Sequence, residues 1–274
     1  MSKSTTMMGT ACVLAMAAIT AGPAAAAPLT DFAGTLTTNF GMWDDDSPGS
    51  DSVKSWLLGG SVAAPLPDLA NLNVQFDASY RHNWADNFSQ EDWNLGGSLF
   101  WASMDGRVGV NFNHATFTSV GHVTNGGVFG EWYLGNLTAM GKAGWLSSGG
   151  SGFGGHGNYL GAALAGYITP DLAITGGVEW GDLVQGQGCQ TCGRQDLRVN
   201  AYELMAEWLF SPAMGLSGYA GYTFVDSKIY TFDSEANIWL IGLRWYTGGG
   251  ALVDRHRNGN LNPWLPALGG FNNF

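Results

Sequence analysis

The clearest chemical motif in this sequence is a pair of cysteines in the stretch Cys189-Gln190-Thr191-Cys192. A C-x-x-C pair can form half of a zinc site or a redox-active dithiol. A zinc site needs two further ligands, however, and a redox pair usually opens a helix after a strand. Neither context surrounds Cys189 and Cys192, so we expect a disulfide that closes a small loop, with metal or redox chemistry as the alternative.

A second group of candidate ligands is acidic and comprises Asp44-Asp45-Asp46 and Asp51. Hard oxygen ligands clustered on one loop suit Ca²⁺. The segment lacks the glycine and the terminal glutamate of an EF-hand loop, so we expect a solvated acidic loop. The sequence therefore predicts neither a metal site nor a cofactor.

The elements that must position these residues are β-strands. From Thr35 to Thr247 hydrophobicity alternates with period two, in segments separated by turn residues. Over 72–81, for example, apolar and polar side chains alternate at every position. We expect twelve strands, near 35–43, 53–64, 72–83, 91–103, 107–118, 125–134, 137–147, 157–168, 172–182, 197–209, 215–227 and 235–247.

The predicted connectors alternate between long and short. The connectors at 44–52, 83–90, 119–124, 148–156, 183–196 and 227–234 are longer or more polar, whereas those at 65–71, 104–106, 135–136, 170–171 and 211–214 are short. Long loops at one end, short turns at the other and an even number of strands are typical of a transmembrane β-barrel. Both ends of such a barrel lie on the periplasmic side.

The composition agrees with a barrel and excludes other classes. A net charge of −11 repels nucleic acid, and 45% hydrophobic residues with only 12% charged residues argue against a disordered chain. The 42 glycines argue against a helical enzyme. We expect aromatic residues near the strand ends to lie at the two membrane interfaces, namely Trp43, Trp84, Trp93, Trp101, Trp132, Trp145, Tyr167, Trp180, Trp208, Trp245 and Tyr246.

The N-terminus has the features of a secretory signal peptide. Lys3 supplies one positive charge, residues 7–21 are small and apolar, and an Ala-x-Ala pattern ends at Ala27. The remaining chain has no run of 18 apolar residues, so we expect no membrane-spanning helix. The predicted organisation is a signal peptide over 1–27, a barrel over 28–248 and a tail over 249–274.

These features resemble the outer-membrane β-barrel proteins of Gram-negative bacteria, including small porins. Barrels of this class usually end in a strand with a glycine followed by alternating aromatic residues, and residues 242–247 are similar. The resemblance implies an all-β, single, antiparallel, up-and-down barrel of about twelve strands, with ten or fourteen as neighbouring values. It also implies contact with outer-membrane lipid and lipopolysaccharide, and leaves a homo-oligomer open, because porins often form trimers.

Two enzyme classes are found among such barrels, and each has a characteristic sequence motif. Outer-membrane lipid acyl hydrolases typically carry His-x-Ser on one strand face, and none of the five histidines here has a serine two residues later. Outer-membrane aspartyl-type proteases typically carry an Asp-x-Asp pair and an Asp-x-His pair. Asp44-x-Asp46 and Asp254-x-His256 match in letters, but the predicted topology puts them at opposite ends. We therefore expect no enzymatic activity.

The polar face of the predicted strands should line the lumen, because a charged side chain on the lipid face costs about 2–4 kcal/mol at mid-membrane for Arg or Lys. If the glutamates face open water, the pore favours cations; if they pair with the basic residues, they close a narrow barrel. The predicted pore-lining residues are Gln75, Asp77, Arg81, Asn94, Arg107, Asn111, Asn113, Glu131, Lys142, Glu179, Glu203, Glu207 and Arg244.

The tail leaves two alternatives. An irregular periplasmic extension is the first, and a plug that places Arg255 and Arg257 against lumen carboxylates is the second. The sequence as a whole favours a porin-like channel for passive diffusion of small hydrophilic solutes, with a cation preference. The alternative is a non-conducting structural or surface-interaction barrel.

Overall fold

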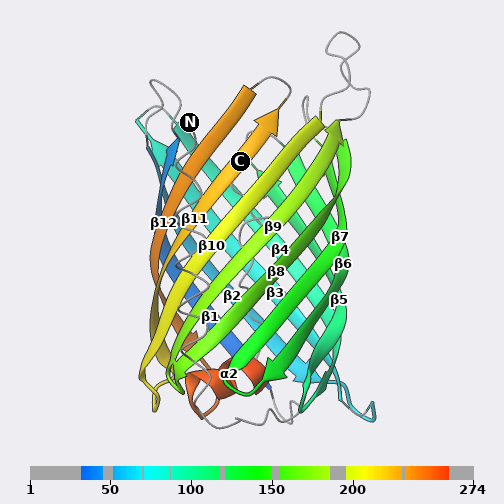
Figure 1. Cartoon of the computed structure of the whole chain (residues 1–274), viewed down its shortest axis with the longest axis vertical. Helices are drawn as coiled ribbons and strands as arrows, with labels where there is room; N and C mark the ends of the chain where they lie inside the picture. Colours follow the sequence, from blue (N-terminus) through cyan, green and yellow to red (C-terminus); the bar gives the residue numbers. More distant parts are fainter. Residues whose placement is uncertain are drawn as a thin grey trace.

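The computed structural model describes residues 32–45, 52–69, 71–86, 88–117, 121–149, 155–185, 196–229 and 232–258, and these form a closed barrel (Figure 1). The predicted twelve-stranded fold is confirmed. The strands are β1 (Ala33–Asp45), β2 (Val53–Pro65), β3 (Leu72–Ala85), β4 (Phe88–Ser103), β5 (Gly106–Phe117), β6 (Gly121–Leu134), β7 (Leu137–Gly149), β8 (Gly155–Thr169), β9 (Leu172–Gln185), β10 (Asp196–Ser211), β11 (Leu216–Ile229) and β12 (Phe232–Tyr246).

Every strand pairs antiparallel with its neighbours in sequence, and β1 pairs with β12 to close the sheet. The closing register runs from Thr35 opposite Tyr246 to Asp45 opposite Ala236. Closure matters because no lipid group can hydrogen-bond an unpaired strand edge. The signal peptide predicted over 1–27 lies outside the described residues.

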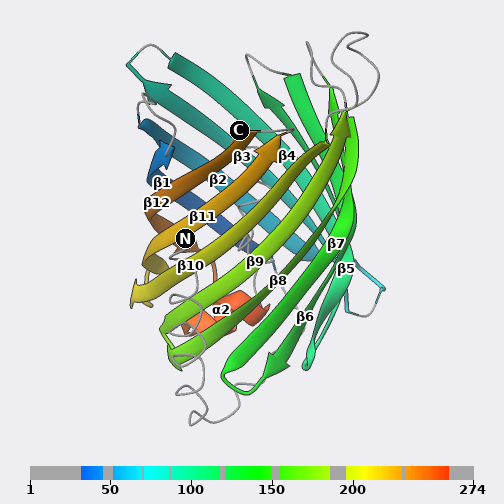
Figure 2. The same cartoon turned by 45° about the horizontal axis from the view of Figure 1, so that its top comes forward.

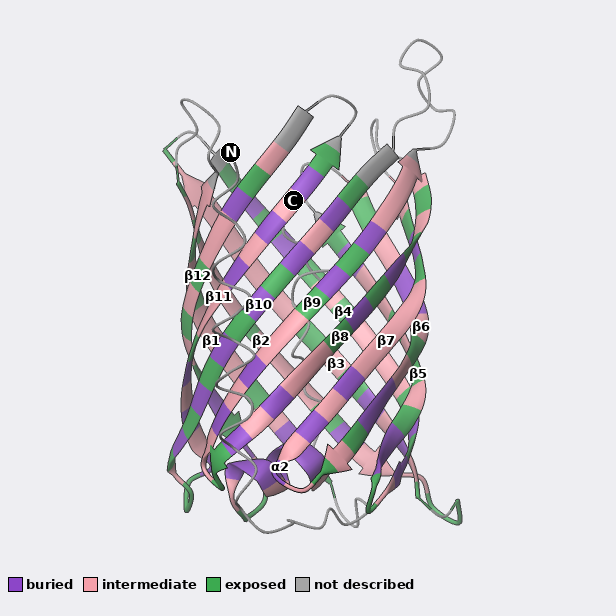
Figure 3. Cartoon of the chain, viewed as in Figure 1, coloured by how far each residue is buried: buried purple, intermediate pink, exposed green. Residues whose placement is uncertain are grey.

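Side chains alternate between the lipid face and the interior, as the period-two pattern predicts (Figure 3). On β4, Trp93, Leu95 and Trp101 are exposed on the outer surface, while Asp92 and Phe100 are buried. The barrel thus exposes its large apolar side chains and buries many charged ones. This inverts the usual arrangement of a water-soluble protein and matches a barrel surrounded by lipid.

Exposed tryptophans form two groups along the barrel axis. One group lies near the short turns and the other toward the opposite end, as expected for interfacial girdles. Tyr167 and Tyr246, which the sequence assigned to an interface, are instead 3% and 7% exposed, and Trp43 packs against an inward apolar cluster. The group near the short turns comprises Trp101, Trp132, Trp208 and Trp245, and the other comprises Trp93, Trp145 and Trp180. Trp239 is also exposed but lies at the middle of β12.

The helix α2 (Leu252–Asn258) follows β12 and lies across the short-turn end of the barrel (Figure 2). The Val253 amide donates to the Pro170 carbonyl oxygen at 3.0 Å, and Leu252 is fully buried. The expectation of an irregular tail is therefore wrong for these residues. Within the part of the chain that the structure describes, no helix is long and apolar enough to cross a membrane.

Candidate functional site

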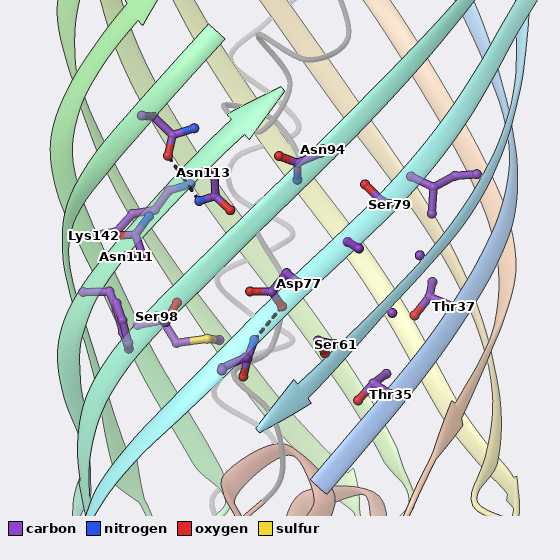
Figure 4. Close-up of a pocket in the computed structure, with 18 of the residues that line it drawn as sticks. Thr35, Thr37, Ser61, Asp77, Ser79, Asn94, Ser98, Asn111, Asn113 and Lys142 are labelled. Carbon is purple, nitrogen blue, oxygen red and sulfur yellow. Dashed lines mark hydrogen bonds between the residues drawn. The ribbon is translucent and has the colours of Figure 1, made fainter. Parts of the chain in front are cut away.

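The barrel interior contains a cavity of about 360 Å³ lined by side chains from strands around the wall (Figure 4). Most of the polar residues predicted for the lumen contribute to it. Arg107, Glu179 and Glu207 are buried elsewhere in the barrel and are described below. The predicted residues that line the cavity are Gln75, Asp77, Arg81, Asn94, Asn111, Asn113, Glu131, Lys142, Glu203 and Arg244.

One side of the cavity is built from neutral polar side chains of β3, β4 and β5, and we call Ser79, Asn94, Ser98, Asn111 and Asn113 the polar wall (Figure 4). The Asn113 amide nitrogen donates to Asn125 Oδ1 at 3.2 Å. Amide and hydroxyl groups both donate and accept hydrogen bonds. The polar wall can therefore contact an uncharged polar solute without an opposing charge.

Beside the polar wall, the Asp77 carboxylate faces the cavity. The Gln75 side-chain amide donates to Asp77 Oδ1 at 2.7 Å. Both residues come from the polar face of β3, which the sequence predicted from its strict alternation. This hydrogen bond fixes the orientation of the carboxylate toward the lumen.

A tyrosine on β8 lies flat against the barrel wall because two facing positions carry no side chain. A Cβ atom added to Gly127 would meet the Tyr159 hydroxyl at 2.5 Å, and one added to Gly144 would meet the Tyr159 ring at 2.6 Å. The ring therefore occupies the space that two ordinary side chains would fill. These glycines make room for a buried tyrosine ring on the inner side of the wall.

Ion pairs between basic side chains and glutamates lie inside the described part of the barrel. Arg107 Nη2 is 2.8 Å from Glu131 Oε2, Lys142 Nζ is 2.8 Å from Glu179 Oε1, and Arg244 Nη1 is 2.5 Å from Glu207 Oε2. Of the two alternatives considered from the sequence, pairing thus holds for these three glutamates. Removing one partner of such a pair leaves an uncompensated buried charge, which costs several kcal/mol.

Small residues allow one of these pairs to span an intervening strand. Lys142 on β7 and Glu179 on β9 are both opposite Gly161 on β8. Because Gly161 has no side chain, the lysine and glutamate meet above it. Ser217 of β11 similarly lies opposite Arg244, and its hydroxyl donates to Glu207 Oε1 at 2.6 Å.

Glu203 differs from the other three glutamates. Its carboxylate lines the cavity and is 9% exposed, yet Oε2 has no hydrogen-bond partner. Buried acceptors without a donor are rare in native proteins. Glu203 Oε2 is thus a buried acceptor without a donor among the described residues, on a side chain that lines the cavity.

The helix α2 is joined to the barrel through His256. The two ring nitrogens of this histidine lie 2.9 Å from the Tyr246 hydroxyl and 3.1 Å from the Tyr167 hydroxyl. Its Nε2 is also 3.5 Å from Glu207 Oε2, and Tyr246 donates to Glu207 Oε1 at 2.7 Å. The sequence did not predict this role for His256, because the plug alternative rested on Arg255 and Arg257 alone.

The two arginines of α2 bind main-chain oxygen atoms of the short turns. Arg257 Nη2 donates to the carbonyls of Gly135 at 2.7 Å and Leu137 at 2.8 Å, and Arg255 Nη2 donates to the Pro212 carbonyl at 2.8 Å. Both guanidinium groups thus bind main-chain oxygen atoms, which neither alternative for the tail predicted. Burial lowers the pKa of the Arg257 guanidinium, because water is replaced by protein around the charge.

The barrel wall also binds the main chain of α2. Arg107, already paired with Glu131, donates through Nη2 to the His256 carbonyl. The Tyr133 hydroxyl donates to the Arg257 carbonyl at 3.2 Å. Contacts with several strands thus hold the end of α2, where the carbonyl groups of a helix lack partners within the helix.

Several sequence candidates are not brought together. Asp44 lies at the long-loop end of β1, whereas Asp254 lies in α2 at the opposite end of the barrel. Asp44 and Asp254 therefore do not meet as the protease motif would require. Among the described residues, no group of three or more His, Cys, Asp or Glu side chains could hold a metal ion. Cys189, Cys192, Asp46 and Asp51 lie outside the described residues.

Comparisons with known proteins support the fold. No protein-family model matches the sequence, and no characterised protein has a significantly similar sequence. An outer-membrane channel from Pseudomonas putida F1 is similar in structure, with a TM-score of 0.56 at 12% identity over 81% of this chain and 97% of that chain.

Two further solved structures are similar. The translocator domain of the autotransporter NalP from Neisseria meningitidis has a TM-score of 0.51 at 13% identity, over 87% of this chain and 94% of that chain. The KdgM porin in complex with disordered oligogalacturonate has a TM-score of 0.49 at 9% identity, over 76% of this chain and 98% of that chain. At these identities the likeness concerns the fold.

The closed antiparallel barrel, its apolar exterior and its aromatic girdles define the class of this chain. It has the fold of an outer-membrane β-barrel. The polar cavity inside the wall is its candidate functional site, and α2 covers the short-turn end of that site.

Proposed function

We propose that this protein is an outer-membrane channel for the passive diffusion of small hydrophilic solutes. The observation that carries the proposal is the polar cavity of about 360 Å³ in the lumen, lined by amides, hydroxyls and charged groups. A purely structural barrel can fill its interior with side chains and does not require a polar cavity of this size. The long-loop end faces the exterior and the short-turn end faces the periplasm, following the rule for this class.

The proposed channel has a weak preference for cations. Three of the glutamates predicted to line the pore are paired with basic residues, which removes most of their effect on a passing ion. Asp77 and Glu203 are the carboxylates of the cavity outside these pairs. Lys142 and Arg244 of the same lining are already paired with Glu179 and Glu207, so Asp77 and Glu203 account for the proposed preference.

We further propose that α2 restricts the periplasmic end of the channel. The helix crosses the short-turn end of the barrel. Side chains of four strands contact it, namely Arg107 of β5, Tyr133 of β6, Glu207 of β10 and Tyr246 of β12. The turns contribute Asp171, which accepts from the Leu252 amide, and Pro212, which accepts from Arg255. Solute leaving the lumen at this end has to pass beside α2 or wait for it to move. The tail is then a plug at the short-turn end, rather than a solvated extension.

Proteoliposome swelling tests the channel proposal directly. Vesicles containing the folded protein should swell in isotonic glucose faster than in isotonic stachyose, because a narrow polar lumen favours the smaller solute. Bilayer reversal potentials across a KCl gradient should show a cation preference that moves toward zero in Asp77→Asn and Glu203→Gln. Equal swelling in both sugars, at the rate of protein-free vesicles, would refute the channel.

A non-conducting structural barrel is the second candidate. The observation that favours it is the combination of three internal ion pairs with α2 across one end, because together they fill part of the lumen. This candidate predicts no swelling in either sugar from protein shown to be folded. The two candidates are therefore separated by the same experiment.

A further inference from the structure

Unpartnered hydrogen-bond acceptors line the lumen cavity. Asn94 Oδ1, Asn111 Oδ1 and Glu203 Oε2 are each buried without a hydrogen-bond partner, and all three residues belong to the cavity lining. They come from β4, β5 and β10, so they approach the cavity from different parts of the wall. A molecule that satisfies them must bring hydrogen-bond donors.

The charges around the cavity decide which donors are suitable. Glu131 is paired with Arg107, Lys142 with Glu179 and Arg244 with Glu207, so these charges are compensated within the wall. A charged solute of either sign would lose hydration without gaining a counter-charge from these pairs. An anionic solute would in addition place its charge near the Asp77 carboxylate. Uncharged hydroxyl donors avoid both costs.

The rest of the lining suits a molecule with several hydroxyl groups. Ser79, Ser98 and Asn113 of the polar wall both donate and accept, as hydroxyl groups do. The cavity volume of about 360 Å³ falls within the range of about 300–1,000 Å³ that is usual for small-ligand sites.

We propose that the cavity is a binding site for an uncharged polyhydroxylated solute of monosaccharide to disaccharide size, with Asn94, Asn111 and Glu203 accepting hydrogen bonds from its hydroxyl groups. The inference rests on the proposed channel function and deepens it, because it names the class of solute. It assigns specificity to residues inside the lumen rather than to the loops. Binding in this lumen cavity would then favour the passage of this class of solute through the channel.

Binding of three molecules that share one carbon skeleton tests the proposal. Ligand-observed saturation-transfer NMR on the full chain in detergent measures glucose, which is uncharged, glucosamine, which is cationic, and gluconate, which is anionic. Glucose should show the strongest saturation. Its affinity should fall about fivefold in both Asn94→Leu and Glu203→Gln, because each variant removes one hydrogen-bond acceptor from the lining.

The matched control is Glu235→Gln on β12, since Glu235 is exposed and outside the cavity lining. This variant should bind glucose as the unaltered protein does, and heat-modifiable migration in gels should confirm that all variants are folded. Stronger binding of glucosamine or gluconate, or glucose binding that is unchanged in both lumen variants, would overturn the proposal. Binding in detergent does not require conduction, so silent bilayers with intact glucose binding would refute the channel and leave this site standing.

Discussion

At the residue scale, Gly127 and Gly144 determine where Tyr159 lies. Both positions face the interior, and the tyrosine ring covers the space above them. A methyl group at Gly127 would lie 2.3 Å from the Ala143 carbonyl oxygen and 2.5 Å from the Tyr159 hydroxyl. The first contact involves main chain and cannot be relieved by rotating a side chain.

Gly127→Ala should therefore destabilise the folded barrel by about 1–3 kcal/mol, the usual cost of overpacking. Urea unfolding in lipid or detergent, followed by tryptophan fluorescence, measures this change. Gly249→Ala is the matched control, because a Cβ atom at Gly249 meets nothing within 4 Å. Equal stability of the two variants would contradict the described packing of Tyr159.

The polar residues of the lumen were predictable because lipid and water impose opposite requirements on alternate side chains. The sequence placed Asn94, Asn111 and Glu203 on the inner face from this alternation alone. Their partners were not predictable in the same way. Lys142 meets Glu179 across Gly161, a contact that depends on the registers of two strand pairs, and long loops leave such registers open.

At the element scale, α2 is a short helix that depends on its surroundings. Isolated helices of seven residues are unstable in water, so contacts with the barrel must hold this one in place. This explains why the sequence did not predict it: the tail lacks a long helical period, and its stabilising partners lie in distant turns. Pro170, Gly135 and Pro212 contribute carbonyl groups that only the folded barrel brings together.

Arg257→Met should loosen α2, because it removes hydrogen bonds from a guanidinium to two buried carbonyl oxygens. The docking of the helix should weaken by about 1.5–3 kcal/mol, the usual value for bonds to a charged group. Single-channel recordings should then show more frequent transitions to a larger conductance.

The control for this prediction is Arg198→Met. Arg198 is exposed on β10 near the long-loop end, so the same substitution there removes a charge far from α2. Recordings of the control should resemble those of the unaltered protein. Identical recordings for Arg257→Met and the unaltered protein would show that α2 does not limit conductance.

At the scale of the whole molecule, the barrel combines an apolar exterior, a polar cavity and a covered end. The exterior and the strand number follow from composition and period, because a closed barrel is the β-structure that can satisfy its main chain in lipid. How far the lumen is filled depends instead on tertiary contacts of charged side chains and of α2. In the proposed channel, these contacts restrict one end.

Conductance in planar bilayers, with and without residues 249–274, tests this account most directly. The full chain should give small, stable, weakly cation-selective steps, and the shortened chain should give larger steps because α2 no longer covers the short-turn end. Both proteins must first be shown to be folded and inserted. Silence from both would contradict the channel, and equal steps from both would contradict the role assigned to α2.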